Sequence, residues 1–187
     1  MKRGKLIILS GPSGVGKGTI REKLFEYDKL NLAYSISMTT RKPRANEQHG
    51  VDYFFVDEVE FKEKITKGEL IEWAQFVGNY YGTPKEYVEK LLDEGKNVVL
   101  EIEVQGAMQV KGMFPEALSI FIVPPSLEEL ERRIRKRSTE PADVMDARLK
   151  KAAYELTLTG EYQYVVENNT LEQTVEHIEK IIEDNIN

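Results

Sequence analysis

The feature that most constrains this chain is the segment LIILSGPSGVGKGTI at residues 6–20. The apolar run at 5–10 predicts a buried strand, and residues 17–25 predict a helix. Between them lies the pattern G-x-x-x-x-G-K, in which glycines let successive backbone N–H groups turn toward one anion at the positive end of the helix. The segment predicts a nucleotide phosphate-binding loop in which Lys17 reaches the β- and γ-phosphates, built from Gly11, Pro12, Ser13, Gly14, Val15, Gly16, Lys17, Gly18 and Thr19.

Gly18 is a departure from the usual pattern, because a Ser or Thr hydroxyl commonly follows the lysine. Thr19, one place later, can supply a hydroxyl to a metal ion or to a phosphate. Mg²⁺ is also often held largely by water and phosphate oxygens. The sequence leaves both arrangements open, with Thr19 as the candidate metal contact.

Composition limits the classes of partner. The chain has 187 residues, of which 41% are hydrophobic and 31% charged, as in an ordinary globular protein with one main core. The net charge of -6 argues against a general nucleic-acid binder, and no apolar stretch approaches the length of a membrane span. The chain has no Cys, which excludes disulfides, and the apolar run before the glycines is too short for a signal peptide, so we expect a cytoplasmic protein.

The alternation of strand and helix patterns predicts an α/β fold. Further strands are predicted at 97–104, 118–124 and 162–167, and an amphipathic helix at 171–186. Such a rhythm is typical of a mostly parallel core sheet flanked by helices. Helix starts are indicated by capping pairs or a first-turn proline, at Asp57 with Glu60, Thr83-Pro84 and Ser126 with Glu129.

The segment between the first helix and residue 96 has a different pattern. Short strands are predicted at 34–41, 52–56 and 70–83, the last interrupted by a Gly-Asn turn at 78–79, which indicates a small lobe inserted into the core. The polar segment 137–143 predicts a mobile loop or lid. We therefore expect a core at 1–33, the inserted lobe at 34–96, core again at 97–125, a lid at 126–146 and core at 147–187.

A second anion site is indicated by RKPR at residues 41–44. Arg41 and Arg44 lie three apart with Pro43 stiffening the link, and two guanidiniums offer paired donors to a terminal phosphate. Tyr53 and Tyr81 fall in the same lobe and can add phenolic donors. An isolated arginine pair is usually solvated surface, but here it accompanies a first phosphate site.

Two further charged groups fit a nucleotide site. Glu101 and Glu103 lie two apart on the strand predicted at 97–104, so we expect both to face the same side near its carboxyl end, where α/β sheets bind ligands. Arg133 and Arg137 lie four apart on one helix face, with Arg148 beyond the lid loop. The arginine-rich helix is also compatible with a solvated surface or a nucleic-acid patch, and the acidic net charge weakens the second of these.

At three places the sequence resembles the guanylate kinase family: TTRKPRANEQHGVDYFFV, IEWAQFVGNYYGT and LEIEVQGA. The resemblance runs from the glycine loop to VVEN at 165–168. It implies the fold of a P-loop nucleoside monophosphate kinase, with a GMP-binding lobe and a lid inserted into the core. It also implies transfer of the ATP γ-phosphate to GMP and dGMP, with Mg²⁺ as cofactor. Whether the protein forms a homodimer stays open.

The resemblance further implies residue roles. The GMP phosphate is held by Arg41, Arg44, Tyr53 and Tyr81. The guanine base is contacted by Ser37, Glu72, Thr83 and Glu103, and Glu101 lies near the metal or the phosphates at the same acceptor site. The ATP phosphates are enclosed by Arg133, Arg137 and Arg148, and Asn168 lies near the adenine. Catalysis then rests on Lys17, Arg44, Arg137 and Arg148.

The chemistry of Glu72 agrees with its implied role. Guanine presents N1–H and N2–H₂ side by side, and one carboxylate accepts from both. Adenine has no such pair of donors and would leave the carboxylate poorly satisfied, which provides discrimination. In the family, Asp is common at one or both of positions 101 and 103, where this chain has Glu, and Glu167 stands where an apolar residue is usual.

Three other functions fit the sequence less well. A kinase for another nucleoside monophosphate would retain the loop and the arginines but give no reason for Glu72. A non-catalytic guanylate-kinase-like scaffold domain would have no need of Lys17, Arg44 and the arginine-rich lid. A regulatory GTPase would require an N-K-x-D segment that reads guanine, and the sequence has none.

Overall fold

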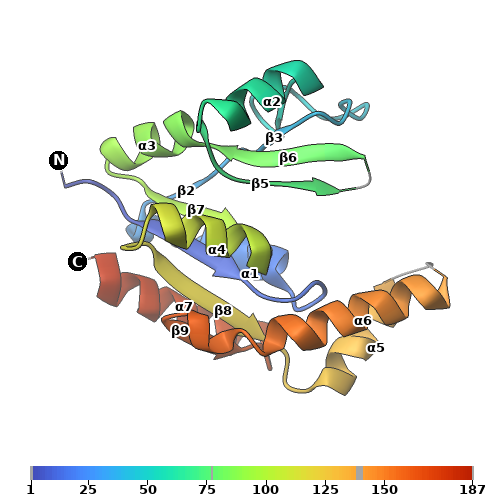
Figure 1. The fold of residues 1–187 in the computed structure, drawn as a ribbon. Helices are drawn as coiled ribbons and strands as arrows, with labels where there is room; N and C mark the ends of the chain where they lie inside the picture. The colour runs from blue at the N-terminus through green and yellow to red at the C-terminus, as the bar shows by residue number, and fades with distance from the viewer. Residues whose placement is uncertain (1, 77, 138–140, 187) are drawn as a thin grey trace.

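The computed structural model describes residues 2–76, 78–137 and 141–186. Its centre is a five-stranded, wholly parallel sheet (Figure 1). In spatial order the strands are β2 (Leu32–Tyr34), β7 (Asn97–Glu101), β1 (Leu6–Ser10), β8 (Leu118–Val123) and β9 (Tyr164–Glu167). The prediction of an α/β fold around a mostly parallel sheet is confirmed.

Helices cover both faces of this sheet, which explains why its central strand is apolar at every position but the last. On β1, Ile7 and Leu9 pack with helices α1 (Lys17–Leu24) and α7 (Leu171–Ile186), whereas Leu6 and Ile8 pack with α3 (Lys85–Asp93) and α4 (Val104–Met113). The side chains of successive residues alternate between the faces, as the period of a strand requires. None of the helices in the described ranges combines the length and apolar character that crossing a bilayer requires.

A second sheet of four strands lies apart from the first (Figure 1). Its order is β4 (Phe54–Phe55), β3 (Met38–Thr39), β6 (Asn79–Pro84) and β5 (Leu70–Phe76), and helix α2 (Glu58–Thr66) packs on it through Phe61. Its buried core consists of Met38, Phe61 and Leu70. The domain boundaries given above stay a prediction.

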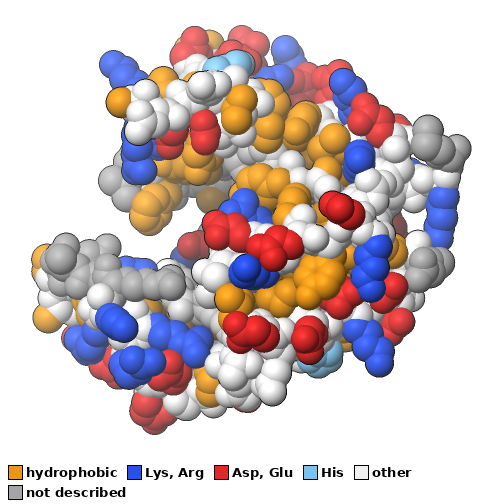
Figure 2. Space-filling view, turned by 180° about the vertical axis from the view of Figure 1, so that it is seen from behind, with side chains coloured by type: hydrophobic (Ala, Val, Ile, Leu, Met, Phe, Trp, Pro, Cys, Tyr) orange, Lys and Arg blue, Asp and Glu red, His pale blue; other side chains and the backbone are white. Residues whose placement is uncertain are grey.

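Helices α5 (Leu127–Arg137) and α6 (Ala142–Leu156) form an arm beyond β8 (Figure 1). Seen from behind, the molecule is hollowed on one side between this arm and the part that carries the second sheet, and Lys and Arg side chains gather on the arm (Figure 2). Two short 3-10 turns, Asp28–Leu30 and Thr159–Glu161, complete the fold. Of the predicted lid loop 137–143, residues 138–140 lie outside the described residues.

Two of the predicted helix caps are confirmed. The Asp57 side chain accepts a hydrogen bond from the Glu60 backbone N–H at 2.8 Å, and Ser126 Oγ accepts from the Glu129 N–H at 3.0 Å. The cap predicted at Thr83 is wrong, because the residue before α3 is Pro84 and the Thr83 hydroxyl bonds elsewhere.

Two predicted strands need correction. The strand predicted at 97–104 ends at Glu101, and α4 begins at Val104 with Glu103 as its N-cap residue. Glu101 and Glu103 therefore do not share a strand face. The strand predicted at 34–41 is divided between the two sheets, since Tyr34 ends β2 whereas Met38 and Thr39 form β3.

Candidate active site

The glycine loop connects the carboxyl end of β1 to α1 and is packed tightly. Gly14 and Gly16 have φ of 84° and 105°, in the left-handed region that favours glycine. A Cβ at Gly14 would lie 2.8 Å from Ile134 Cγ1, and one at Gly16 would lie 2.8 Å from Asn168 Nδ2. Conformation and close packing together require glycine at both positions.

Lys17 lies across this loop. Its Nζ donates to the carbonyl oxygens of Gly11 at 2.6 Å and Pro12 at 3.2 Å. Burial lowers the pKa of Lys17, and the nearby carboxylates Glu101 and Glu103 oppose that shift. Lys17 also lines a cavity of about 370 Å³, which we call the donor cavity. The residues that line it are Ser13, Gly14, Gly16, Lys17, Gly18, Thr19, Glu101, Ile102 and Glu103.

A second cavity of about 450 Å³ also borders the glycine loop and is lined partly by Arg132, Arg133, Asn168 and Asn169. Asn168 is buried, and its Nδ2 donates to Val15 O at 2.8 Å while its Oδ1 accepts from Thr174 Oγ1 at 3.1 Å. This amide therefore fastens the glycine loop to α7, a role that sequence reasoning did not predict.

The structure also explains Glu167, which stands where the family usually has an apolar residue. It is exposed at the end of β9, and its Oε1 accepts a hydrogen bond from Asn169 Nδ2. A carboxylate here orients an amide of the cavity lining.

Of the arginines on the arm, Arg148 contacts the glycine loop and Arg133 contacts Asn168, just after the end of β9. Arg148 on α6 donates from Nη2 to Ser13 Oγ at 2.9 Å. Arg133 on α5 donates to Glu129 at 2.8 Å and to the Asn168 carbonyl at 3.3 Å. Arg132 and Arg133 together lower the pKa of Glu129 to about 2. Arg137 ends α5, and its side chain lies outside the described part of the structure.

Glu101 and Glu103 carry different partners. Glu101 Oε2 forms an ion pair with Arg21 Nε at 3.0 Å, and the Arg21 guanidinium lies 4.3 Å from the centre of the Tyr34 ring. Glu103 Oε2 lies 2.6 Å from Lys151 Nζ on α6. Each carboxylate is thus paired with a cation from a helix distant in the sequence, Arg21 on α1 or Lys151 on α6, so the sequence near residues 101–103 could not indicate either pair.

The arginine loop of the second sheet is braced by Glu47. This carboxylate accepts from Arg41 Nη2 at 2.8 Å and from the backbone N–H of Arg44 at 2.8 Å. The Arg41 guanidinium lies 5.4 Å from the centre of the Tyr53 ring, and the Tyr53 and Tyr81 rings are 6.3 Å apart in an edge arrangement. The structure brings Arg41, Tyr53 and Tyr81 together, whereas Arg44 is joined to them through its backbone N–H and Glu47 and is itself exposed. Sequence reasoning missed Glu47, which an acidic residue three places after Arg44 could have indicated.

Glu72 is buried in the wall of a further cavity. It is 9% exposed, and its Oε1 accepts from Thr83 Oγ1 at 2.6 Å. Burial raises the pKa of Glu72, and the Thr83 hydrogen bond opposes that rise. The cavity has about 330 Å³, and we call it the acceptor cavity; among its lining residues are Ser37, Glu72, Phe76, Tyr81, Glu101, Glu103, Gly106 and Lys151.

The donor and acceptor cavities share residues 101–103. A phosphate chain on the glycine loop and a second ligand beside Glu72 would therefore meet at the end of β7. Such an arrangement can hold two ligands for direct transfer of a group between them.

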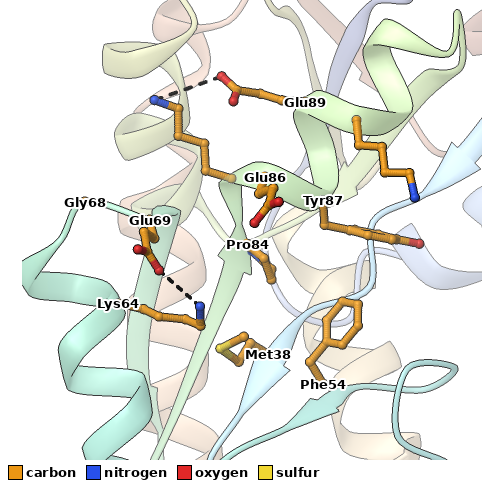
Figure 3. Close-up of a pocket in the computed structure, with 11 residues that line it drawn as sticks. Met38, Phe54, Lys64, Gly68, Glu69, Pro84, Glu86, Tyr87 and Glu89 are labelled. Carbon is orange, nitrogen blue, oxygen red and sulfur yellow. Dashed lines mark hydrogen bonds and ion pairs between the residues drawn. The ribbon is translucent and has the colours of Figure 1, made fainter.

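A cavity larger than the donor and acceptor cavities lies elsewhere. It has about 520 Å³ and lies between α2, α3 and the second sheet, with Met38, Phe54 and Pro84 among its walls (Figure 3). Its lysines Lys64 and Lys85 pair with Glu69 at 3.1 Å and Glu89 at 4.0 Å. This cavity shares no lining residue with the donor or acceptor cavity.

Comparison with known proteins agrees with a site for two nucleotides. A family profile described as guanylate kinase matches residues 3–185. The guanylate kinase of Bacillus anthracis is 58% identical over 181 residues, which cover 97% of this chain and 88% of that protein. The guanylate kinase of Bacillus subtilis is 52% identical over 181 residues, covering 97% of this chain and 89% of its own.

Solved structures agree with the sequences. The crystal structure of guanylate kinase from Anaplasma phagocytophilum matches with a TM-score of 0.76 at 38% identity, over 100% of this chain and 88% of that one. Shikimate kinase from Bacteroides thetaiotaomicron has a TM-score of 0.54 at 17% identity, which shows the fold alone. Because the family profile spans nearly the whole chain and both bacterial relatives share more than half of its residues, the chain belongs to the guanylate kinase family of phosphotransferase enzymes.

Proposed function

We infer that this protein transfers the γ-phosphoryl group of ATP to GMP, giving ADP and GDP, and that it also accepts dGMP. The observation that supports this most directly is the junction at residues 101–103, where the donor cavity over the glycine loop meets the acceptor cavity that contains Glu72. The donor cavity borders a glycine loop of the type that binds phosphates. The acceptor cavity contains the buried Glu72 carboxylate, which can accept hydrogen bonds from the two neighbouring N–H groups of guanine.

The transfer needs no covalent enzyme intermediate. A phosphate oxygen of GMP attacks the γ-phosphorus in line, a new O–P bond forms, and the bond between the γ-phosphorus and the β–γ bridging oxygen breaks as ADP leaves. Lys17 and the loop N–H groups stabilise negative charge on the donor. We propose that Arg133, Arg137 and Arg148 enclose the ATP phosphates from the arm, and that Arg148 is well placed for this through its contact with Ser13.

On the acceptor side we propose two groups of contacts. The GMP phosphate is bound by Arg41, Arg44, Tyr53 and Tyr81. The guanine is bound by Ser37, Glu72, Thr83 and Glu103, of which Ser37, Glu72 and Glu103 line the acceptor cavity and Thr83 holds Glu72. Water must be kept from the γ-phosphoryl group, so we expect the arm and the second sheet to approach one another when both nucleotides are bound.

The donor set fits Mg²⁺. The Thr19 hydroxyl and the Glu101 carboxylate line the donor cavity, and both are the hard oxygen ligands that this ion prefers. We propose that these two residues hold it together with phosphate oxygens and water. Bound there, Mg²⁺ would neutralise charge on the β- and γ-phosphates. Asn168 would lie near the adenine, and we expect the protein to act in the cytoplasm on the free nucleotide pool.

The test is an assay of ADP release with ATP as donor and GMP, dGMP, AMP, UMP or CMP as acceptor. GMP and dGMP should support turnover, and the other three should be poor acceptors because none presents the two donors that Glu72 accepts. A preference for AMP, or no turnover with any acceptor, would contradict the proposal.

A further inference from the structure

Lys151 is a charged residue of the acceptor cavity that the reaction as described does not use. It lies on α6, and its ammonium contacts Glu103 Oε2 at 2.6 Å. A second carboxylate, Glu155, lies one helical turn further along with its Oε1 at 3.9 Å from the same ammonium. Glu155 is 6% exposed, so one of the two carboxylates that locate Lys151 is itself fixed by burial.

Helix α6 thereby contacts both halves of the site within one turn. Arg148 reaches Ser13 of the glycine loop at 2.9 Å, and Lys151, three residues later, reaches Glu103 in the lining of the acceptor cavity. Glu103 is the residue that precedes α4, its side chain makes no capping hydrogen bond, and it lines both the donor and the acceptor cavity. The position of this carboxylate therefore depends on a cation from the arm.

We propose that Lys151 is a positioning residue for the acceptor nucleotide, which holds the Glu103 carboxylate at the junction of the two cavities while α6 holds Arg148 over the donor loop. Lys151 contacts Oε2 of Glu103, and among the described residues none donates to Oε1. That second oxygen is available to a donor of the bound base. The inference rests on the proposed function, because it takes GMP as the acceptor.

The central variant is Lys151→Met, which removes the charge and retains an unbranched side chain. Because Lys151 and Glu103 are 57% and 59% exposed, the expected effect is that of a solvent-screened pair, an increase in the KM for GMP of about three- to fivefold. The KM for ATP should stay within about twofold of wild type, because Arg148 and Ser13 are untouched. Lys151→Arg should restore the KM for GMP, since it keeps a cation at this position.

Two further measurements separate positioning from a general structural role. In a double-mutant cycle, Lys151→Met should add little to Glu103→Gln, because the pair is already broken. The ratio of the KM for GMP in Lys151→Met to that of wild type should fall toward one as the salt concentration rises from about 0.05 M to about 0.5 M. The matched control is Lys150→Met, an exposed neighbour on the same helix, which should behave as wild type.

Equal KM values for GMP in Lys151→Met and Lys150→Met would overturn the inference. So would parallel increases in the KM for ATP and GMP, or full additivity with Glu103→Gln. These outcomes leave the proposed function intact, since they require a wild-type protein that phosphorylates GMP. A wild-type protein that fails to turn over GMP would overturn the proposed function and this inference together.

Discussion

Glu72 shows how a single buried residue can exchange stability for selectivity. Burial raises the pKa of Glu72 above its ordinary value of 4.5, so the folded chain favours the protonated form more than the unfolded chain does. The cost of burying the charge is thus present at neutral pH and is relieved as the pH falls through the folded-state pKa. Glu72→Gln should raise Tm at pH 7.5, and this advantage should shrink as the pH approaches 4.5.

The same substitution should weaken GMP binding. A neutral amide presents an N–H₂ group where the base needs an acceptor, so we expect the KM for GMP to rise roughly 10- to 100-fold. Thermal melts across this pH range and steady-state kinetics measure the two effects. Glu69→Gln, at an exposed carboxylate that lines neither the donor nor the acceptor cavity, is the control. Loss of stability at neutral pH in Glu72→Gln would show that the buried charge is compensated by contacts other than Thr83.

Lys17 and Arg44 should separate turnover from acceptor binding. Lys17→Met removes the cation at the phosphate loop, and we expect kcat to fall by at least about 100-fold with little change in the KM for GMP. Arg44→Met should mainly raise the KM for GMP, because Arg44 belongs to the arginine loop of the second sheet. Initial rates with each nucleotide varied in turn provide the comparison. Equal and mild effects from both substitutions would contradict the roles assigned here.

At the scale of single residues, the sequence was sufficient to predict a contact when the two partners lie a few residues apart along the chain. The glycine loop and the Asp57 and Ser126 caps were predictable because their partners lie a few residues away. The contact of Asn168 with Val15 spans 153 residues and that of Lys151 with Glu103 spans 48, so only the fold brings them together. Among the predicted site residues the roles of individual side chains stay predictions.

At the scale of elements, the end of β7 shows a limit of periodicity. The run NVVLEIEV continues an apolar pattern past Glu101, and a pattern of this kind cannot locate the last paired residue. The last paired residue of β7 is set by its neighbour in the sheet, because Leu9 near the end of β1 pairs with Glu101 and the chain then turns into α4. The fold class was predictable from the order of the elements, whereas this boundary depended on a neighbouring strand.

Helix α4 offers a matched pair of glycines. A Cβ at Gly106 would lie 2.9 Å from Glu72 Oε2, whereas one at Gly112 would meet nothing within 4 Å. Alanine favours a helix by up to about 1 kcal/mol over glycine, so Gly112→Ala should stabilise the protein and leave the kinetics unchanged. Gly106→Ala must displace the Glu72 carboxylate, and we expect the KM for GMP to rise by at least about tenfold. Unchanged GMP kinetics in both variants would show that Glu72 can move without loss of binding.

The whole molecule is built on two cores of unequal size. The five-stranded sheet has extensive buried clusters on both faces, whereas the second sheet encloses Met38, Phe61 and Leu70 with a few half-buried neighbours. Local stability follows the buried apolar surface that a unit contains. The second sheet, which we propose binds the acceptor, is therefore expected to open first.

Hydrogen exchange read out by mass spectrometry tests this expectation. In the free protein, amides of β3, β5 and β6 should exchange at least about tenfold faster than those of β1, β7 and β8, because the second sheet can open without unfolding of the first. GMP should slow exchange in the second sheet, because the contacts proposed for it with Arg41, Tyr81 and Glu72 lie in or next to that sheet, while a non-hydrolysable ATP analogue alone should protect the glycine loop. Uniform exchange across both sheets would contradict independent opening. In the proposed binding mode GMP links the second sheet to residues 101–103, so its protection should extend to the end of β7. Binding to the second sheet alone would leave residues 101–103 unprotected.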